Sequence, residues 1–196
     1  MLQNAFSLRS IYRCYNSALM EDLETWIKRA QKGDKSAFEN IYNFFYKRIH
    51  RYCDYNLRKK EIAEDIAQET FIKCWKSLPS FSFRKGGSFQ AFLFRIARNL
   101  IIDESRKKKT IKLEEYLEED ADQNLEEELD KRDKESRIKD AINKLEELDK
   151  QIIILRYFED LSFSEVEEVT SIKSGALRVR THRILKKLSE ELGKNE

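Results

Sequence analysis

The sequence is poor in proline and cysteine and has no long apolar run. One proline occurs in 196 residues, whereas 38% of the residues are charged. Such a composition suits exposed helices and does not suit β-sandwiches or barrels. The three cysteines, Cys14, Cys53 and Cys74, lie at unrelated spacings and cannot all pair, which argues against a disulfide framework and against a zinc site. We therefore expect an all-α protein of the reducing cytoplasm, without a metal or other cofactor.

The lack of a long apolar run argues against a membrane-spanning helix. The chain length limits the number of domains. No segment approaches the ~20 apolar residues that a membrane-spanning helix needs, so we expect no membrane insertion. A chain of 196 residues has room for one ordinary domain or for two small helical ones with modest cores. Two small domains fit the pattern of charge better.

The charged residues divide the chain into blocks. The net charge is only +2, which taken alone argues against a polyanionic partner. However, basic residues predominate from 20 to 110, acidic residues predominate from 111 to 135, and Lys173 to Lys187 holds only basic charges. An acidic chain repels itself, and 111–135 has too few apolar residues to offset the entropy of ordering it. We expect two small helical domains, 20–110 and 136–196, joined by a flexible acidic linker.

Residues 1–19 carry two arginines and no acidic residue. This composition superficially resembles an organellar transit peptide. The interpretation that we prefer is a disordered extension in front of an amphipathic segment that begins near Met20.

In the first block, one helix is predicted to have two contrasting sides. Ala63, Ala67, Phe71 and Cys74 recur at helical spacing, which is typical of a side that packs on a core. The opposite side has the same period, but it combines acidic and amide groups with an apolar residue in their middle. This docking face consists of Asp65, Gln68, Glu69 and Ile72. We interpret it as a surface that binds a protein partner.

Residues 79–89 are predicted to form a loop, because they include the proline, two consecutive glycines and three serines. The loop also holds Phe81 and Phe83 beside Arg84 and Lys85. Aromatic rings beside cations suit unpaired bases, since stacking contributes roughly 1–3 kcal/mol per base and needs no particular sequence. Two interpretations stay open: the loop holds single-stranded DNA, or both phenylalanines simply cover the core.

The next predicted helix has a cationic side. Phe89, Leu93 and Leu100 are spaced for packing, whereas the polar side carries arginines around one asparagine, Asn99. Arginine makes phosphate contacts that position a nucleic acid, and an asparagine amide makes paired hydrogen bonds to a base edge. Asn99 is therefore the candidate reader of a base. The cationic candidates are Arg95, Arg98 and Arg106.

The second block contains a predicted helix-turn-helix. Ser162 and Glu165 have the spacing of a capping box, a short helix follows, and a turn at 170–172 leads to a longer helix. The longer helix has a basic surface, and its first residues are placed to reach base edges in a major groove. The candidate DNA contacts are Lys173, Ser174, Ala176, Arg178, Arg180 and Arg183. A generic helical hairpin with a solvated basic face is the alternative.

Four segments match motifs of one known family. Asp65-Ile-Ala-Gln-Glu-Thr-Phe71 with Trp75 is similar to D-x-x-Q-E-T-F-x-x-x-W, and Phe92-Leu-Phe-Arg-Ile-Ala-Arg-Asn-Leu100 with Asp103 is similar to W-L-x-x-I-A-x-N-x-x-x-D. Leu161-Ser-Phe-Ser-Glu-Val166 and Gly175-Ala-Leu-Arg-Val-Arg-Thr-His-Arg183 are similar to L-S-x-x-E-I and G-T-V-x-S-R-x-H-R. Over about residues 21–192, the chain resembles the sigma-70 family of bacterial RNA polymerase sigma factors, specifically its extracytoplasmic-function (ECF) group.

The resemblance implies a non-enzymatic factor that binds RNA polymerase core, recognises promoter DNA and promotes its melting. The docking face would bind the clamp coiled coil of the largest polymerase subunit, and the polymerase flap is a second implied contact. The loop from Ser80 to Ser88, together with Asn99, would capture a flipped base of the minus-ten element. The helix from Lys173 to Leu188 would read the minus-thirty-five element. The acidic linker would thread the RNA exit channel, and an anti-sigma factor is a further implied partner.

Two residues of the helix-turn-helix depart from the family's pattern. Glu167 stands where family members usually have alanine, and Ser171 stands where they have glycine. A carboxylate cannot be buried without a partner between packed helices, and serine at a positive φ costs roughly 1 kcal/mol relative to glycine. We expect Glu167 either to reach the surface or to open the motif slightly.

Two other classes of function compete with this interpretation. Glu64, Asp65 and Glu69 cluster along one helix, but no phosphate-binding loop or metal-ligand set accompanies them, which argues against an enzyme. A stand-alone helix-turn-helix transcriptional regulator would need only the carboxy-terminal motif. It would leave the docking face unexplained.

Overall fold

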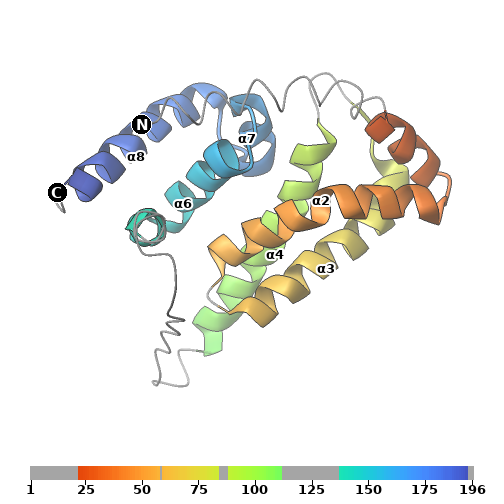
Figure 1. The fold of residues 1–196 in the computed structure, drawn as a ribbon, viewed down its shortest axis with the longest axis horizontal. Helices are drawn as coiled ribbons and strands as arrows, with labels where there is room; N and C mark the ends of the chain where they lie inside the picture. The colour runs from red at the N-terminus through yellow and green to blue at the C-terminus, as the bar shows by residue number, and fades with distance from the viewer. Residues whose placement is uncertain (1–21, 58, 84–87, 112–136, 194–196) are drawn as a thin grey trace, which may run out of the picture.

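The structure is a computed structural model that describes residues 22–57, 59–83, 88–111 and 137–193. These residues form helices joined by short turns, and no strand occurs among them. An amino-terminal group of helices ends at residue 111 and a carboxy-terminal group begins at residue 137 (Figure 1). The predicted all-α class with two helical regions is confirmed. The predicted extension, 1–19, and the predicted linker after Ile111 lie outside the described residues, so the domain boundaries remain predictions.

Three long helices build the amino-terminal region. A helical segment at 22–30 precedes α2 (Lys35–Asn56), α3 (Lys60–Ser77) and α4 (Phe89–Ile111), and a short 3-10 turn, η1 (Leu78–Ser80), follows α3. The start of α2 is determined by its cap, because the Asp34 carboxylate accepts hydrogen bonds from the main-chain N–H groups of Ser36 and Ala37 at 3.0 and 3.2 Å.

The core of this region lies between the apolar sides of α2, α3 and α4. Ile41 and Ile49 on α2 are fully buried at helical spacing. Ring contacts connect the helices: the Tyr42 and Phe71 centroids lie 4.7 Å apart between α2 and α3, and those of Tyr52 and Phe94 lie 5.2 Å apart between α2 and α4. Burying one such side chain stabilises the fold by about 1.5–3 kcal/mol, so these contacts fix the relative positions of the three helices.

The carboxy-terminal region is built from shorter helices. A helical segment at 137–143 is followed by α6 (Glu147–Ile153), one turn of π-helix, η2 (Ile154–Phe158), α7 (Phe163–Thr170) and α8 (Ser174–Gly193). The core of this region includes five side chains that are at most 1% exposed: Ile152, Leu155, Val166, Leu177 and Ile184. α7 and α8 form the predicted helix-turn-helix.

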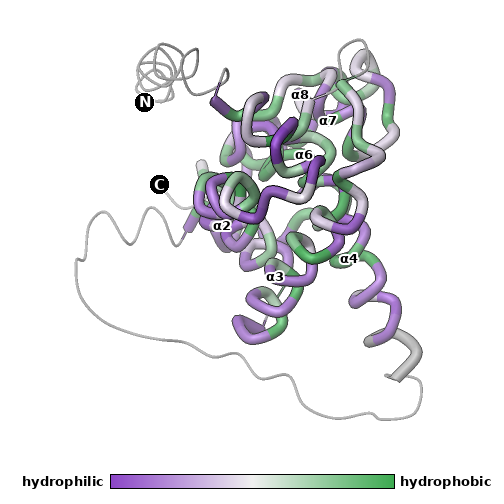
Figure 2. The backbone as a smooth tube through the Cα atoms, turned by 90° about the vertical axis from the view of Figure 1, so that its right-hand side faces the viewer, coloured by the Kyte–Doolittle hydropathy of each residue, from purple (hydrophilic) through white to green (hydrophobic). Residues whose placement is uncertain are grey.

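The two regions pack against each other rather than lying apart. α7 lies against α4, while α6 and η2 lie against α2. Figure 2 shows α6, α7 and α8 together on one side of the α2, α3 and α4 group. The buried apolar side chains of both regions therefore form one cluster.

Candidate nucleic-acid and protein interfaces

The docking face lies on the outer side of α3. Ala63, Ala67 and Cys74 are fully buried, and because successive residues of a helix are about 100° apart, the opposite side of α3 faces solvent. All four members of the docking face are exposed: Asp65, Gln68, Glu69 and Ile72. Ile72 is 54% exposed, so the face has an apolar centre with acidic and amide neighbours. The structure thus leaves this surface open to a partner.

The two loop phenylalanines differ from each other. Phe81 is half-buried and packs on Phe89 and Phe92, with ring centroids 5.4 and 4.8 Å away. Phe83 is 49% exposed and touches the edge of Phe81, 5.1 Å away. Phe81 therefore covers the core, whereas the ring of Phe83 is available to stack on a base. Arg84 and Lys85 lie outside the described residues.

Gln31 supports the start of this loop, although the sequence pattern does not single it out. Its Nε2 group donates hydrogen bonds to the main-chain carbonyls of Leu78 and Phe81 at 3.1 and 2.7 Å. These bonds attach η1 and the base of the aromatic loop to the turn after the first helical segment. No local signal reveals such a contact, because its partners are 47 and 50 residues away.

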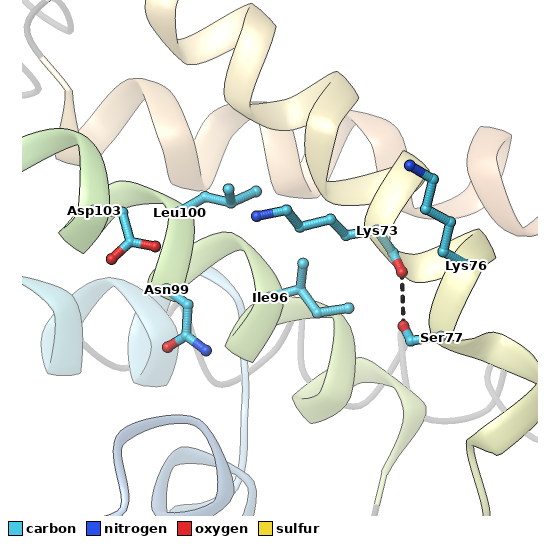
Figure 3. A pocket seen from close by; sticks show the side chains of 7 residues that line it. All are labelled: Lys73, Lys76, Ser77, Ile96, Asn99, Leu100 and Asp103. Atoms are coloured by element: carbon cyan, nitrogen blue, oxygen red, sulfur yellow. Dashed lines mark hydrogen bonds between the residues drawn. The ribbon is translucent and has the colours of Figure 1, made fainter.

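A hollow of about 460 Å³ opens between the end of α3 and the middle of α4. Figure 3 shows Asn99 and Asp103 projecting from α4, with the lysines of α3 on the other side and Ile96 between them. Its full lining is Lys73, Lys76, Ser77, Ile96, Asn99, Leu100 and Asp103. An exposed amide, an exposed carboxylate, two cations and an apolar base are thereby brought together. Lys73 and Lys76 are additions to the predicted site, since their own helix suggests only a solvated charge.

The arginines predicted along α4 have different surroundings. Arg95 is exposed, with its guanidinium 5.9 Å from the centre of the Phe92 ring, and Arg106 is exposed near Asp103. Arg98 is half-buried, and its Nε donates a hydrogen bond to Oε1 of Gln151 at 2.9 Å. A residue predicted to contact DNA is therefore occupied here by the carboxy-terminal region.

The helix-turn-helix has the local geometry that its sequence predicts. Ser162 and Glu165 form the capping box: the Glu165 amide donates to the Ser162 hydroxyl at 3.2 Å, and the Ser162 amide donates to the Glu165 carboxylate at 2.7 Å. Ser171 has φ of 62°, the left-handed conformation that glycine adopts without strain. Serine at this turn therefore lowers the stability of the fold by about 1 kcal/mol relative to glycine.

Glu167 does not open the motif, because it has a partner inside the motif. Its Oε2 accepts a hydrogen bond from the main-chain N–H of Ser174 at 2.8 Å. Ser174 is the first residue of α8, where N–H groups lack helical partners and the helix dipole favours a negative charge. A half-buried Glu167 thus joins α7 to the start of α8 in place of the usual alanine contact.

Removing this contact should destabilise the protein. We expect Glu167→Ala to lower the free energy of unfolding by about 1 kcal/mol, the usual loss for a helix cap. For a chain of this size the melting temperature falls by roughly 2–4 °C. Glu167→Gln keeps an oxygen acceptor and should lose less. Thermal unfolding followed by circular dichroism measures both, with Glu190→Ala on the exposed side of α8 as the control. A Glu167→Ala protein as stable as the control would show that the cap does not contribute.

Four predicted DNA contacts on α8 or beside it are exposed: Lys173, Ala176, Arg178 and Arg183. Ser174 is half-buried at the start of the helix. Arg180 differs from the expectation of a freely exposed side chain, because it forms an ion pair with the buried Asp149 and lies 3.7 Å from Glu146. A buried carboxylate needs such a partner, so Arg180 holds α8 against α6.

The described residues contain no group of three or more histidine, cysteine, aspartate or glutamate side chains that could hold a metal ion. Burial raises the pKa of the Cys53 and Cys74 thiols to about 12, which keeps both protonated and unreactive. Among the described helices, none is long and apolar enough to cross a membrane.

Comparison with known proteins identifies the family. The Sigma-70 region 2 model matches residues 38–111, and the Sigma-70, region 4 model matches residues 135–188. The ECF RNA polymerase sigma factor SigW of Bacillus subtilis (strain 168) is 34% identical over 185 residues, covering 85% of this chain and 94% of SigW. The chain belongs to the ECF group of sigma-70 sigma factors. Below, region 2 of this sigma factor denotes the described residues 22–111, and region 4 denotes 137–193.

One further relative and two solved structures are also similar to this chain. The ECF sigma factor BldN of Streptomyces coelicolor (strain ATCC BAA-471 / A3(2) / M145) is 29% identical over 185 residues, covering 90% of this chain and 67% of BldN. The structure of CnrH in complex with the cytosolic domain of CnrY has a TM-score of 0.68 at 21% identity, covering 89% of this sigma factor and 99% of that chain. The sigma factor RpoE from Bartonella quintana, in complex with the anti-sigma factor NepR, has a TM-score of 0.67 at 24% identity, covering 81% and 98%. At these identities the two structures bear on the fold alone.

Proposed function

We propose that this ECF sigma factor binds RNA polymerase core through the docking face of α3. The observation that carries the proposal is the exposure of Ile72 at the centre of that face. An apolar side chain held in solvent among acidic and amide groups gives a partner helix both a contact to bury and polar groups that set its orientation. The clamp coiled coil of the largest polymerase subunit is the partner that the family resemblance implies.

The minus-ten element would be opened at the end of α3 and along α4. Phe83 is available to stack on an unpaired base, Asn99 would read a base edge, and Lys73 and Lys76 would contact the neighbouring phosphates. Extruding a base costs a few kcal/mol, and stacking with edge recognition offsets a cost of that size. Melting therefore follows from binding to the open form, and no catalytic group is required.

The minus-thirty-five element would be read as duplex by α8. Arg178 and Arg183 would contact phosphates or guanine edges, and Lys173 and Ala176 lie at the end of the helix that enters a major groove first. We do not assign such a contact to Arg180, since Asp149 already holds it. The proposed duplex contacts thus leave out the one arginine that packing of α8 on α6 pairs with a buried carboxylate.

Partners beyond DNA follow from the family. We propose that the sigma factor works in the bacterial cytoplasm, where polymerase and chromosome are found, and that an anti-sigma factor controls it. The similar sigma factor RpoE was co-crystallised with the anti-sigma factor NepR, and the structure of CnrH was solved in complex with the cytosolic domain of CnrY. The acidic residues between the two regions would thread the RNA exit channel, and the flap of polymerase would bind region 4.

Association with core polymerase in the absence of DNA tests this function against that of a stand-alone regulator. We expect the purified full chain to co-elute with bacterial core polymerase in size-exclusion chromatography at micromolar concentration. A stand-alone regulator would bind duplex DNA through region 4 and would remain separate from the polymerase. Failure to co-elute would contradict the proposed function.

A further inference from the structure

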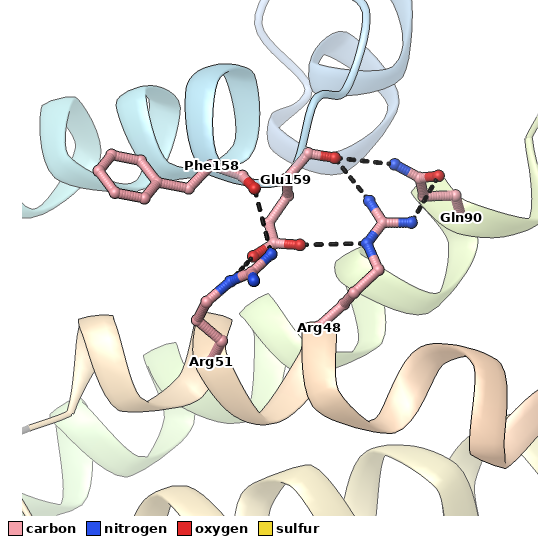
Figure 4. A network of polar contacts seen from close by, with 5 residues as sticks. All are labelled: Arg48, Arg51, Gln90, Phe158 and Glu159. Atoms are coloured by element: carbon pink, nitrogen blue, oxygen red, sulfur yellow. Dashed lines mark hydrogen bonds and ion pairs between the residues drawn. The ribbon is translucent and has the colours of Figure 1, made fainter. Parts of the chain in front are cut away.

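Several polar contacts between the two regions converge on one residue, Glu159. Glu159 follows η2 in region 4, and its side chain is fully buried. Its carboxylate accepts hydrogen bonds from Nε of Arg48 at 3.2 Å and from Nε of Arg51 at 2.9 Å, both on α2 of region 2. Its main-chain carbonyl accepts from Arg48 and from the Gln90 amide. Figure 4 shows the three region 2 side chains surrounding Glu159.

Helix α2 also contacts Phe158, the neighbour of Glu159. Arg51 donates a second hydrogen bond to the main-chain carbonyl of Phe158 at 3.2 Å, and the Phe158 ring lies 5.0 Å from that of Tyr55. Arg48 is held in place by Gln90, whose Oε1 accepts a hydrogen bond from it at 3.1 Å. Region 2 side chains thus donate the hydrogen bonds that Glu159 accepts, and two of them, Arg48 and Gln90, also bond to each other.

A second set of contacts places acidic groups of α7 at the start of α4. The Ser88 hydroxyl donates to Oε1 of Glu165 at 2.7 Å. Burial raises the pKa of Glu168, while a hydrogen bond from the Ser88 main chain and the charge of Arg95 act in the opposite direction, so Glu168 faces the same site. Arg98 is bonded to Gln151 farther along α4. Carboxylates and an amide of region 4 therefore occupy donors of region 2 that suit phosphates and bases.

The burial of Glu159 disfavours arrangements in which the two regions are only partly separated. Burial raises the pKa of Glu159, although the hydrogen bonds and charges of Arg51 and Arg48 oppose this shift. A buried carboxylate is tolerated only with its partners in place, because without them its charge lacks both water and a counterion. When the regions separate, water replaces both arginines at once. Contact and separation are then two distinct states.

The proposed promoter contacts need the separated state. The two elements are about 25 base pairs apart, which is roughly 85 Å of B-form DNA at ~3.4 Å per base pair. Region 4 packs directly on α2 and α4 of region 2, an arrangement that does not suit simultaneous contact with two elements so far apart. The 25 residues between the two regions, 112–136, are enough to allow separation, since a fully extended chain of that length spans roughly 85 Å. By contrast, the docking face on α3 is exposed while the regions are in contact.

We propose that Glu159 is a latch that docks region 4 on the promoter-binding side of region 2 and holds the free sigma factor closed. Region 4 then occupies Ser88 and Arg98 in place of DNA, while polymerase still has access to α3. Promoter binding requires the latch to open, and polymerase binding does not. The closed state itself does not depend on the proposed function, whereas its effect on promoter binding rests on it.

Energy transfer between two dyes on the full chain tests the latch without polymerase or DNA. Donor and acceptor are attached at Glu39→Cys on α2 and Lys139→Cys in region 4, both exposed positions, with Cys14→Ser to remove one native thiol. Cys53 and Cys74 are fully buried and do not label readily. We expect high transfer for the wild-type background. Glu159→Gln should raise the ratio of open to closed molecules at least about tenfold, because the arginines lose their charged partner.

Two further variants guard against misfolding and nonspecific charge effects. Arg51→Glu changes a side chain that is 48% exposed, so it should leave region 2 folded while repelling Glu159. Like Glu159→Gln, it should raise the ratio of open to closed molecules. In the double variant the two increases should not add. Glu190→Gln makes the same change of charge on the exposed side of α8 and should leave transfer high. Low transfer in the wild-type background, or wild-type transfer in both latch variants, would overturn the proposal.

A binding measurement then tests the competition with DNA. Without polymerase, Glu159→Gln should bind a labelled promoter fragment with a single-stranded minus-ten segment several-fold more tightly than Glu190→Gln does. Equal affinities of these two variants would refute the competition. Failure of every variant to bind the fragment or polymerase, with the energy-transfer changes intact, would contradict the proposed function and leave the latch standing.

Discussion

Combining Gln68→Ala with Ile72→Ala is expected to weaken binding of this sigma factor to core polymerase by about tenfold or more. Truncating a central contact of an interface typically costs more than 1 kcal/mol, and 1.4 kcal/mol corresponds to a factor of ten in affinity. Both side chains are exposed on α3 and contribute nothing to the region 2 core. The free energy of unfolding should therefore change by less than about 0.5 kcal/mol.

A fluorescence titration of labelled sigma factor with core polymerase measures this loss. Asn40→Ala is the control, because Asn40 is an exposed residue of α2 and lies outside the docking face. The control should bind like the wild type. Unchanged affinity of the double variant, with its melting temperature also unchanged, would show that polymerase binds elsewhere.

The second large effect is expected at Asn99. Asn99→Ala should reduce promoter opening by about tenfold or more, because a paired amide contact to a base edge contributes roughly 1–3 kcal/mol of recognition. Formation of the closed promoter complex should change far less, since region 4 and the phosphate contacts are untouched. Asn99 is exposed at the rim of the hollow between α3 and α4, so its loss does not disturb the core.

Permanganate footprinting of unpaired thymines reports opening, and a gel shift reports total promoter binding. Asn40→Ala, an exposed asparagine on α2, controls for loss of a surface amide in the same region. If Asn99→Ala reduced the footprint and the gel shift equally, Asn99 would act in binding rather than in opening.

Much of the architecture could be predicted from the sequence, because its signals are local. The stripe of Ala63, Ala67, Phe71 and Cys74 is buried as its spacing predicts, and the residues of the docking face are exposed for the same reason. The capping box, with its S-x-x-E spacing, has the predicted hydrogen bonds. Helical period and capping chemistry depend on residues within a few positions of each other, so one sequence is sufficient to read them.

The side-chain partners could not be predicted in this way. Glu167 caps α8 from seven residues away, and Gln31 reaches carbonyls that are 47 and 50 residues distant. Arg180 belongs by sequence to a basic surface, but Asp149 on another helix draws it into an ion pair. Each of these contacts depends on how helices pack, and the helical period says nothing about which polar groups then meet.

The contact between the regions is the clearest example of this limit. In the sequence, Glu159 is one of many acidic residues and simply follows an apolar run. Arg48 and Arg51 are likewise two of several cations on α2. Only the packing of η2 on α2 brings these three together and buries the carboxylate. The sequence predicts two regions, and the structure adds a specific way in which they associate.

Abortive initiation with purified core polymerase tests whether this sigma factor directs transcription from specific promoters. Core polymerase from the bacterium that encodes this chain is incubated with a set of genomic promoter fragments and initiating nucleotides, with and without the sigma factor. We expect short transcripts from particular promoters only when the sigma factor is present. The absence of promoter-dependent transcripts on every fragment, with sigma factor added in excess, would contradict this expectation.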